Sequence, residues 1–214
     1  MKVIAFNGSP RPDGNTRILL EHVLAPIKAR GIETELFQLG GSYIHGCRGC
    51  YACIQKKNGR CAHDDDVANE CIARMIEADG IILGSPTYFA DLTPETKALI
   101  DRAGFVTRGN GDLLRRKVGA AVIAVRRAGE IHAFDSINHF FLISQMIVPG
   151  SCYWNVGIGR DRGDVQKDDE GLDTMRVLGE NMAWLLEKVA GGKQAVGVGW
   201  RRIGCANKRC SPGD

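Results

Sequence analysis

Four of the eight cysteines of this 214-residue chain lie close together, spaced as Cys47-x2-Cys50-x2-Cys53-x7-Cys61. Thiolates repeated at steps of three can surround one small inorganic core, and bacterial iron–sulfur ligands share these two-residue gaps. Structural zinc more often uses two Cys-x2-Cys pairs with a dozen or more residues between them. The spacing therefore favours an iron–sulfur cluster over zinc. A loop that binds nothing, or that forms a redox disulfide, remains an alternative.

A second group of chemically useful residues follows the first apolar run of the chain, in the stretch Gly-Ser-Pro-Arg-Pro-Asp-Gly-Asn-Thr at residues 8–16. A turn that leads into a helix presents free backbone N–H groups to an anion. Ser9, Arg11, Asn15 and Thr16 could all donate hydrogen bonds to a phosphate, and an arginine can do so with two N–H groups. The stretch matches neither the P-loop nor the dinucleotide-binding pattern. The alternative is an ordinary turn with Asp13 or Asn15 as the helix N-cap.

Two later loops carry residues that suit a flat ring. Pro86, Thr87, Tyr88 and Phe89 follow an apolar strand and offer both backbone N–H groups and aromatic cover. The alternative is that two aromatic side chains are simply buried in a tight turn. Arg126, Ala128 and Gly129 follow the next apolar strand. A cation there would stabilise a reduced, anionic ring, although a solvated basic turn is equally compatible with the sequence.

The elements that must position these loops alternate along the chain. Apolar runs predict strands at 2–6, 33–39, 80–84 and 117–125, and a fifth bracketed by 146–148 and 153–156. Helical spacing predicts helices at 15–30, from Asp66, from Thr93 as N-cap, at 131–145, and in a last apolar stripe that ends at Gly191-Gly192. That stripe consists of Met175, Leu178, Met182, Leu185 and Val189.

Five apolar strands separated by helices predict a doubly wound α/β fold in three α/β/α layers. The common five-strand solution is the flavodoxin-like parallel sheet with order 2-1-3-4-5, which binds ligands at the C-terminal ends of its strands. We expect one domain over residues 1–190, with a Cys-rich loop at 40–63. A basic, flexible tail is expected at 191–214.

Composition excludes several classes of function. The formal net charge is +3, and most of it falls in the tail, so the folded body lacks the basic footprint of a nucleic-acid-binding protein. No stretch has the roughly 20 apolar residues of a membrane helix, and no secretory signal is visible, so we expect a cytoplasmic protein. Cys71 is expected in the core. His45 and His63 flank the cysteine loop, where surface positions are expected, and Cys205 and Cys210 lie in the tail.

The string Gly-Ser-Pro-Arg-x-x-Gly-Asn-Thr, placed directly after an N-terminal strand, resembles the NADPH-dependent FMN reductase family of flavodoxin-like proteins. The resemblance covers about residues 1–190 and implies that Ser9, Arg11, Asn15 and Thr16 hold the FMN phosphate. It also implies that the loop at 86–89 contacts the flavin and that the turn at 126–129 touches its pyrimidine side. Family members often end the second loop as Tyr-x-Gly, whereas this chain reads Tyr88-Phe89-Ala90-Asp91.

All four clustered cysteines together resemble the iron–sulfur flavoprotein branch of that family, which implies a four-iron four-sulfur cluster on Cys47, Cys50, Cys53 and Cys61. Electrons would then pass between NAD(P)H or a ferredoxin-type carrier and an acceptor such as a quinone, with the flavin rather than a catalytic side chain carrying the chemistry. The branch implies a homodimer or homotetramer in which the cluster of one subunit works near the flavin of another. The alternatives are a cluster-free NAD(P)H-dependent FMN, quinone or nitro reductase, a non-enzymatic flavodoxin-like electron carrier, and a zinc-bearing structural protein with a degenerate flavin site.

Overall fold

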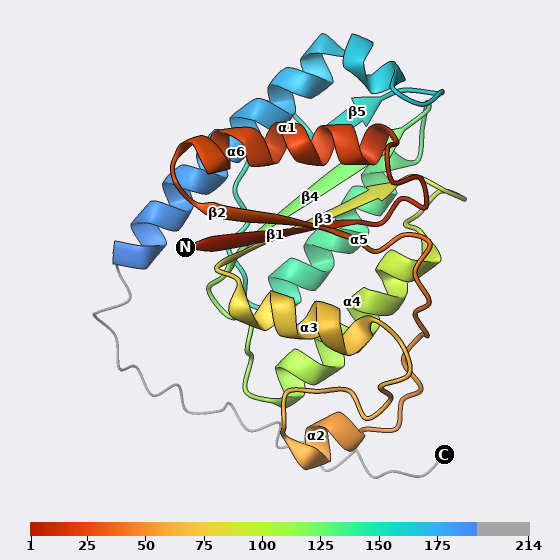
Figure 1. Cartoon of the computed structure of the whole chain (residues 1–214), viewed down its shortest axis with the longest axis vertical. Helices are drawn as coiled ribbons and strands as arrows, with labels where there is room; N and C mark the ends of the chain where they lie inside the picture. Colours follow the sequence, from red (N-terminus) through yellow and green to blue (C-terminus); the bar gives the residue numbers. More distant parts are fainter. Residues whose placement is uncertain (192–214) are drawn as a thin grey trace.

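Five apolar segments of the chain form one parallel sheet with the order β2-β1-β3-β4-β5, as predicted (Figure 1). The computed structural model describes residues 1–191, so the predicted tail and its two cysteines lie outside the described residues from 192 onward. The strands are β1 (Lys2–Asn7), β2 (Glu33–Gln38), β3 (Gly80–Pro86), β4 (Val118–Val125) and β5 (Val156–Ile158).

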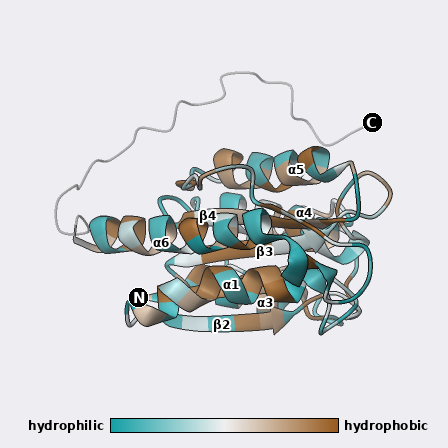
Figure 2. Ribbon diagram, turned by 90° about the horizontal axis from the view of Figure 1, so that it is seen from above, coloured by the Kyte–Doolittle hydropathy of each residue, from teal (hydrophilic) through white to brown (hydrophobic). Residues whose placement is uncertain are grey.

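Helices cover both faces of this sheet, which confirms the predicted three layers. One face is covered by α1 and α6, and the other by α3, α4 and α5 (Figures 1 and 2). In Figure 2 these helices carry both hydrophilic and hydrophobic stretches, as expected where one side of a helix packs on a sheet. The helices are α1 (Asn15–Ala29), α2 (Ala52–Lys56), α3 (Ala68–Glu77), α4 (Pro94–Gly109), α5 (Glu130–Ile143), the 3-10 helix η1 (Asp164–Lys167) and α6 (Asp169–Gly191).

The strands separate two apolar cores because successive side chains point to opposite faces. In β4, Ala120 and Val122 pack toward α1 and α6, whereas Ala121 and Ile123 pack toward α3, α4 and α5. Burial on both faces explains why β4 reads as a continuous apolar run rather than as an alternating one.

Several local predictions are confirmed. Thr93 is the N-cap of α4 and accepts a hydrogen bond from the backbone N–H of Thr96. Cys71 is completely buried in the core, and burial raises the pKa of its thiol to about 12. The stripe of α6 is buried at Met175, Leu178 and Met182.

Two predictions about elements are corrected. The fifth strand is only Val156–Ile158; residues 153–155 precede it, and Ile147 makes just an isolated bridge to Val118. The cysteine-rich stretch is not entirely loop, because α2 forms within it. Among residues 1–191, no helix has the combined length and apolar character that crossing a bilayer requires.

Candidate functional site

Three polar loops meet where β1, β3 and β4 end, at the right of Figure 1. The hydroxyl of Thr93 donates to the carbonyl oxygen of Gly8 (2.9 Å), which joins the loop after β3 to the loop after β1. The backbone N–H of Thr87 donates to the carbonyl oxygen of Ala124 (2.8 Å), which joins the loop after β3 to β4. The predicted convergence of the three loops at one edge of the sheet is therefore present.

The loop after β1 leads into α1, and no side chain of this helix end compensates its free N–H groups or its positive potential. The N-cap of α1 is Gly14, which has no capping side chain, and the first turn of α1 contains no acidic residue. The alternative that Asp13 or Asn15 caps this helix is therefore wrong. The first N–H groups of a helix need partners from outside it, and the helix dipole adds positive potential there. This end of α1 is suited to an anion.

The same loop is held in shape from within and by β2. The hydroxyl of Ser9 accepts a hydrogen bond from the backbone N–H of Arg11 (3.2 Å), and the backbone N–H of Ser9 donates to the side chain of Asn7 (3.1 Å). The amide of Gln38, the last residue of β2, donates to the carbonyl oxygens of Ser9 (2.7 Å) and Gly40 (2.8 Å). The shape of the loop is therefore held by its own hydrogen bonds and by those of Gln38.

The predicted phosphate residues are in different situations. Ser9 and Thr16 are buried beside the loop, and the Arg11 side chain is exposed at its rim. The side-chain amide of Asn15 points elsewhere: it donates to the carbonyl oxygens of Gly159 (3.2 Å) and Asp161 (2.9 Å) and accepts from the backbone N–H of Gly163 (2.9 Å). Asn15 therefore ties the start of α1 to the segment after β5, a role that sequence reasoning missed because the partners lie about 150 residues away.

The predicted residues of the loop after β3 differ in how exposed their side chains are. Tyr88 is half exposed, and Phe89 is fully exposed at 104% of its reference area. The hydroxyl of Thr87 is buried and makes no hydrogen bond within the described part of the chain. A buried hydroxyl without a partner is costly, so this atom suits a ligand that supplies one. The alternative that both aromatic side chains are simply buried in a tight turn is wrong.

The turn after β4 packs against the loop after β3. Gly129 has φ +92° and caps α5, and a Cβ at this glycine would lie 3.1 Å from the Thr87 side chain. Arg126 and Ala128 are exposed at the same edge. The glycine is therefore needed both for its backbone conformation and for the close approach of the two loops.

A clamp that the sequence did not reveal holds the loop after β3 in place. The carboxylate of Asp91 accepts hydrogen bonds from the Ser136 hydroxyl of α5 (3.0 Å) and from the backbone N–H of Leu92 (2.8 Å). His132 of α5 lies 3.4 Å from the same carboxylate. The backbone of Asp91 accepts from the N–H of Tyr88 (2.9 Å), so this residue closes the loop on itself and fastens it to α5.

The four clustered cysteines line one cavity. They belong to the segment between β2 and α3, which includes α2 and lies at the bottom of Figure 1. Cys53 is buried in α2 and Cys61 is half-buried, whereas Cys47 and Cys50 are exposed. Burial, and then the nearby thiol of Cys61, raise the pKa of Cys53. The cavity is small, at about 20 Å³. Over residues 1–191, no group of three or more His, Cys, Asp or Glu residues has the geometry to hold a single metal ion.

Helices α3 and α4 position the two inner cysteines through their backbones. Asn69 of α3 accepts from the N–H of Cys61 (2.8 Å) and donates to its carbonyl oxygen (3.1 Å). Asn110, the C-cap of α4, donates to the carbonyl oxygen of Cys53 (3.2 Å) and accepts from the N–H of Gly59 (2.9 Å). The inner half of the cysteine loop is therefore fixed by side chains that come from outside it.

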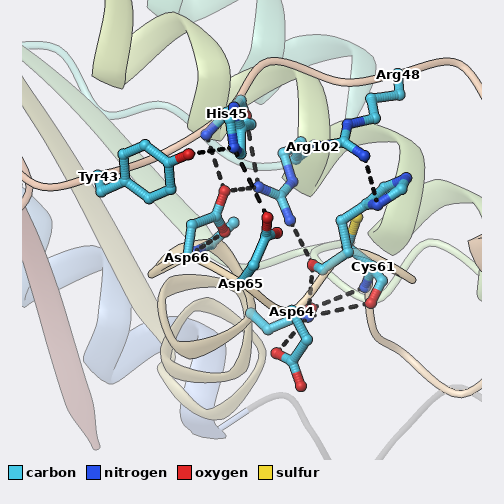
Figure 3. A network of polar contacts seen from close by, with 11 residues as sticks. Tyr43, His45, Arg48, Cys61, Asp64, Asp65, Asp66 and Arg102 are labelled. Atoms are coloured by element: carbon cyan, nitrogen blue, oxygen red, sulfur yellow. Dashed lines mark hydrogen bonds and ion pairs between the residues drawn. The ribbon is translucent and has the colours of Figure 1, made fainter.

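The base of the cysteine loop is closed by a buried ion pair between Arg102 of α4 and Asp66 (Figure 3). The guanidinium also donates to the carbonyl oxygens of His45 (3.5 Å) and His63 (2.7 Å), which flank the loop on its two sides. Burial would raise the pKa of Asp66, but hydrogen bonds from the N–H groups of His45 and Ala68, and then from Arg102, lower the pKa below its usual value.

The Arg102 guanidinium faces the cysteines as well. Burial alone would lower its pKa, but Cys61 and Asp66 beside it hold the pKa above its usual value. The two predicted flanking histidines thus serve the network through their backbone carbonyls. The side chain of His45 contacts the Tyr43 hydroxyl (2.8 Å), and that of His63 contacts Arg48 (3.2 Å).

Known proteins resemble this chain in sequence and in fold. The sequence model of the family described as NADPH-dependent FMN reductase matches residues 1–161. An iron–sulfur flavoprotein of Methanocaldococcus jannaschii is 42% identical over 196 residues, which cover 88% of this chain and 99% of that protein. An iron–sulfur flavoprotein of Methanosarcina thermophila is 31% identical, over 88% of this chain and 97% of that protein.

Solved structures share the fold at low sequence identity. A crystal structure of RosB with the bound intermediate 8-demethyl-8-formylriboflavin-5′-phosphate superposes with a TM-score of 0.71 at 16% identity, over 99% of this chain and 94% of that chain. This likeness shows a common architecture only.

Proposed function

The chain belongs to the NADPH-dependent FMN reductase family, and from this membership we propose that it is a flavin oxidoreductase that binds FMN where the three polar loops meet. The observation that carries the proposal is the N-terminus of α1, which has neither a capping side chain nor an acidic residue in its first turn. A phosphate is the anion that such an end accepts most readily. The relatives named as flavoproteins support the same reading.

The residues at this edge fit FMN. The phosphate would be held by the first backbone N–H groups of α1 and by Ser9, Arg11 and Thr16. The Asn15 side chain would act indirectly, by holding the segment after β5 against the start of α1. The unpartnered hydroxyl of Thr87 would meet the ring or ribityl chain.

The remaining predicted residues would enclose the ring. Pro86, Tyr88 and Phe89 would cover it, and Arg126, Ala128 and Gly129 would lie along its pyrimidine side. Bound FMN can exchange one or two electrons, which links hydride donors to one-electron carriers. The protein would supply position and a positive potential, and the exposed edge would admit the electron donor and acceptor.

We further propose that Cys47, Cys50, Cys53 and Cys61 hold a four-iron four-sulfur cluster. The four thiols line one cavity, and Asn69 and Asn110 fix the inner two. Gly46 precedes Cys47 and Gly49 precedes Cys50, and an added Cβ at either glycine would meet nothing within 4 Å, so the outer half of the loop has room to adjust. The small cavity and the lack of single-ion geometry in residues 1–191 favour the second candidate, a cluster-free NAD(P)H-dependent FMN, quinone or nitro reductase.

As physiological partners we propose NAD(P)H or a ferredoxin-type carrier and a small acceptor such as a quinone. We also propose a cytoplasmic homodimer or homotetramer. Two exposed aromatic side chains in the loop after β3, Tyr88 and Phe89, support an interface at the flavin edge. Free thiols in the cysteine loop support a reducing compartment.

Anaerobic purification followed by an absorbance spectrum and assays of FMN, iron and sulfide tests both parts. We expect stoichiometric FMN and roughly four iron atoms per chain. Cys61→Ser should retain FMN and lose iron, whereas Cys152→Ser, an exposed cysteine outside the cavity, should retain both. Protein with FMN but without iron after reconstitution would support the cluster-free reductase. A colourless protein that takes up no added FMN would contradict the whole proposal.

A further inference from the structure

The wall of the cysteine cavity contains a buried cation whose N–H donors are not all engaged in hydrogen bonds among the described residues. Arg102 lines this cavity together with the four cysteines and is only 2% exposed. Its two terminal nitrogens are engaged by Asp66 and by the carbonyl oxygens of His45 and His63 (Figure 3). Its Nε is buried and makes no hydrogen bond within the described residues. An N–H left without a partner in the interior is costly, so this donor calls for an acceptor inside the cavity.

The other contacts of Arg102 keep the guanidinium in place. The carbonyl oxygens that it binds belong to residues two positions before Cys47 and two positions after Cys61. Asp66 in turn accepts the N–H groups of His45 (2.8 Å) and Ala68 (3.0 Å), so the carboxylate is also fixed. The guanidinium cannot swing toward water without breaking these contacts, so it stays beside the cavity that Arg102 lines.

We propose that Arg102 sets the reduction potential of the cluster, by donating a hydrogen bond from Nε to a sulfur atom at the Cys61 side of the cavity and by placing a positive charge there. This inference rests on the cluster proposed above. Hydrogen bonds to cluster sulfurs and nearby net charge are two of the levers that set such potentials. Both act in the same direction, because each stabilises the more negative, reduced form of the cluster.

The negative charge of Asp66 offers a second, independent test of the assignment. The ion pair is buried, so the field of the guanidinium at the sulfurs is partly cancelled by the carboxylate on its other side. Removal of the guanidinium charge and removal of the carboxylate charge should therefore move the potential in opposite directions.

The test is an anaerobic redox titration of the reconstituted protein, with FMN, iron and sulfide measured in every sample. In Arg102→Gln, the ratio of reduced to oxidised cluster at the wild-type midpoint should fall at least about tenfold, which is a shift of about 59 mV for a one-electron centre. In Asp66→Asn the ratio should rise. Arg108→Gln is the matched control, because Arg108 lies on the same helix but is exposed and pairs only loosely with Asp112 (3.9 Å); its midpoint should match that of the wild type.

The outcomes separate this inference from the proposal beneath it. Wild-type protein that binds FMN but no iron overturns the cluster and this assignment together. A normal iron content in Arg102→Gln with an unshifted midpoint overturns the assignment alone. If Arg102→Gln loses iron, Asp66→Asn decides: a raised midpoint supports the assignment and an unchanged or lowered one overturns it. If both variants lose iron but retain FMN, Arg102 has only a structural role in the cysteine loop. That outcome would also overturn the assignment of Arg102 to the reduction potential.

Discussion

Ala90 adopts a backbone conformation that L-residues seldom adopt, with φ +60°. It stands at the position where the resemblance to flavin reductases suggested glycine. The left-handed conformation is therefore present at position 90 although the residue is alanine and not glycine. The hydrogen bond between Asp91 and Ser136 of α5 helps to hold it.

Ala90→Gly should raise the free energy of unfolding by about 0.5–1 kcal/mol, since relief of the left-handed strain exceeds the added entropy of the unfolded chain. Urea denaturation of the apoprotein measures this change. The control is Ala25→Gly in the exposed interior of α1, which should lower the free energy by about 1 kcal/mol. Destabilisation by both substitutions would mean that Ala90 is not strained.

Asn15 illustrates how a residue can matter to a ligand without touching it. Asn15→Ala should speed hydrogen exchange at the Gly163 amide and weaken FMN binding about tenfold, because a partly buried set of hydrogen bonds worth about 1.4 kcal/mol is lost. Amide exchange and fluorescence titration with FMN measure the two effects. Asn181→Ala removes a single exposed side-chain bond, to the carbonyl oxygen of Gly150, and should change neither. Weaker FMN binding with unchanged exchange at Gly163 would instead indicate direct contact with the phosphate.

At the scale of elements, long apolar segments were predictable and short ones were not. The strands at 80–84 and 117–125 could be recognised because burial on both faces demands apolar residues throughout. The five-residue α2 and the three-residue β5 contain too few residues for a periodic pattern. Their positions depend on tertiary contacts, such as that of Asn110 with Cys53, which the sequence does not display.

The same division applies to the candidate site. The spacing of the cysteines and the location of the loop after β1 follow from local sequence. The network of Arg102, Asp66 and Asn69 could not be inferred, because an arginine in an amphipathic helix is usually exposed. Burial of Arg102 becomes apparent only when α3, α4 and both ends of the cysteine loop are brought together.

The buried pair makes the anchoring of the cysteine loop to its helices sensitive to acid. The pKa of Asp66 is lowered in the folded state, so its contribution to stability is complete above the unfolded pKa and is lost as pH falls through the folded pKa. Asp66→Asn should cost about 3–5 kcal/mol at neutral pH, because it leaves the Arg102 charge buried without its partner. The gap in unfolding free energy between wild type and variant should stay constant down to roughly pH 5 and shrink below roughly pH 4.

Urea denaturation at several pH values measures this gap. Asp101→Asn is the control, since this aspartate is exposed and pairs with Lys97 at the surface. Its gap should stay near zero throughout. A gap for Asp66→Asn that does not shrink as far as pH 3 would contradict the assignment of the pKa shift to the ion pair.

At the scale of the whole molecule, the two candidate sites share α4, whose N-cap Thr93 joins the loops after β1 and β3, but their other supports differ. The loops at the end of the sheet are braced by Asn7, Gln38 and Asp91, whereas the cysteine loop is held by α3 and α4. FMN at 100 times its dissociation constant should therefore stabilise the chain by about 2.7 kcal/mol, whether or not the cysteines are intact.

Thermal unfolding of wild type and Cys47→Ser with added ligand measures this effect. Riboflavin at the same concentration should produce a smaller rise in melting temperature, because it lacks the phosphate that the start of α1 would bind. Equal rises with FMN and riboflavin would remove the phosphate site from the proposal. A rise with FMN in the wild type but not in Cys47→Ser would show that the two sites depend on each other.

The two sites approach each other along the chain at Gly40, which follows β2. A Cβ at this position would lie 2.2 Å from the carbonyl carbon of Ser9, so no other residue fits there without moving the loop after β1. Beyond Gly40 the hydroxyl of Ser42 still donates to the carbonyl oxygen of Gln38 at the end of β2 (3.1 Å), and the chain then runs to its contacts with α3 and α4. The segment downstream could therefore differ in length, in its cysteines or in what it binds without disturbing the loop after β1. Gly40 itself would have to persist through every such replacement.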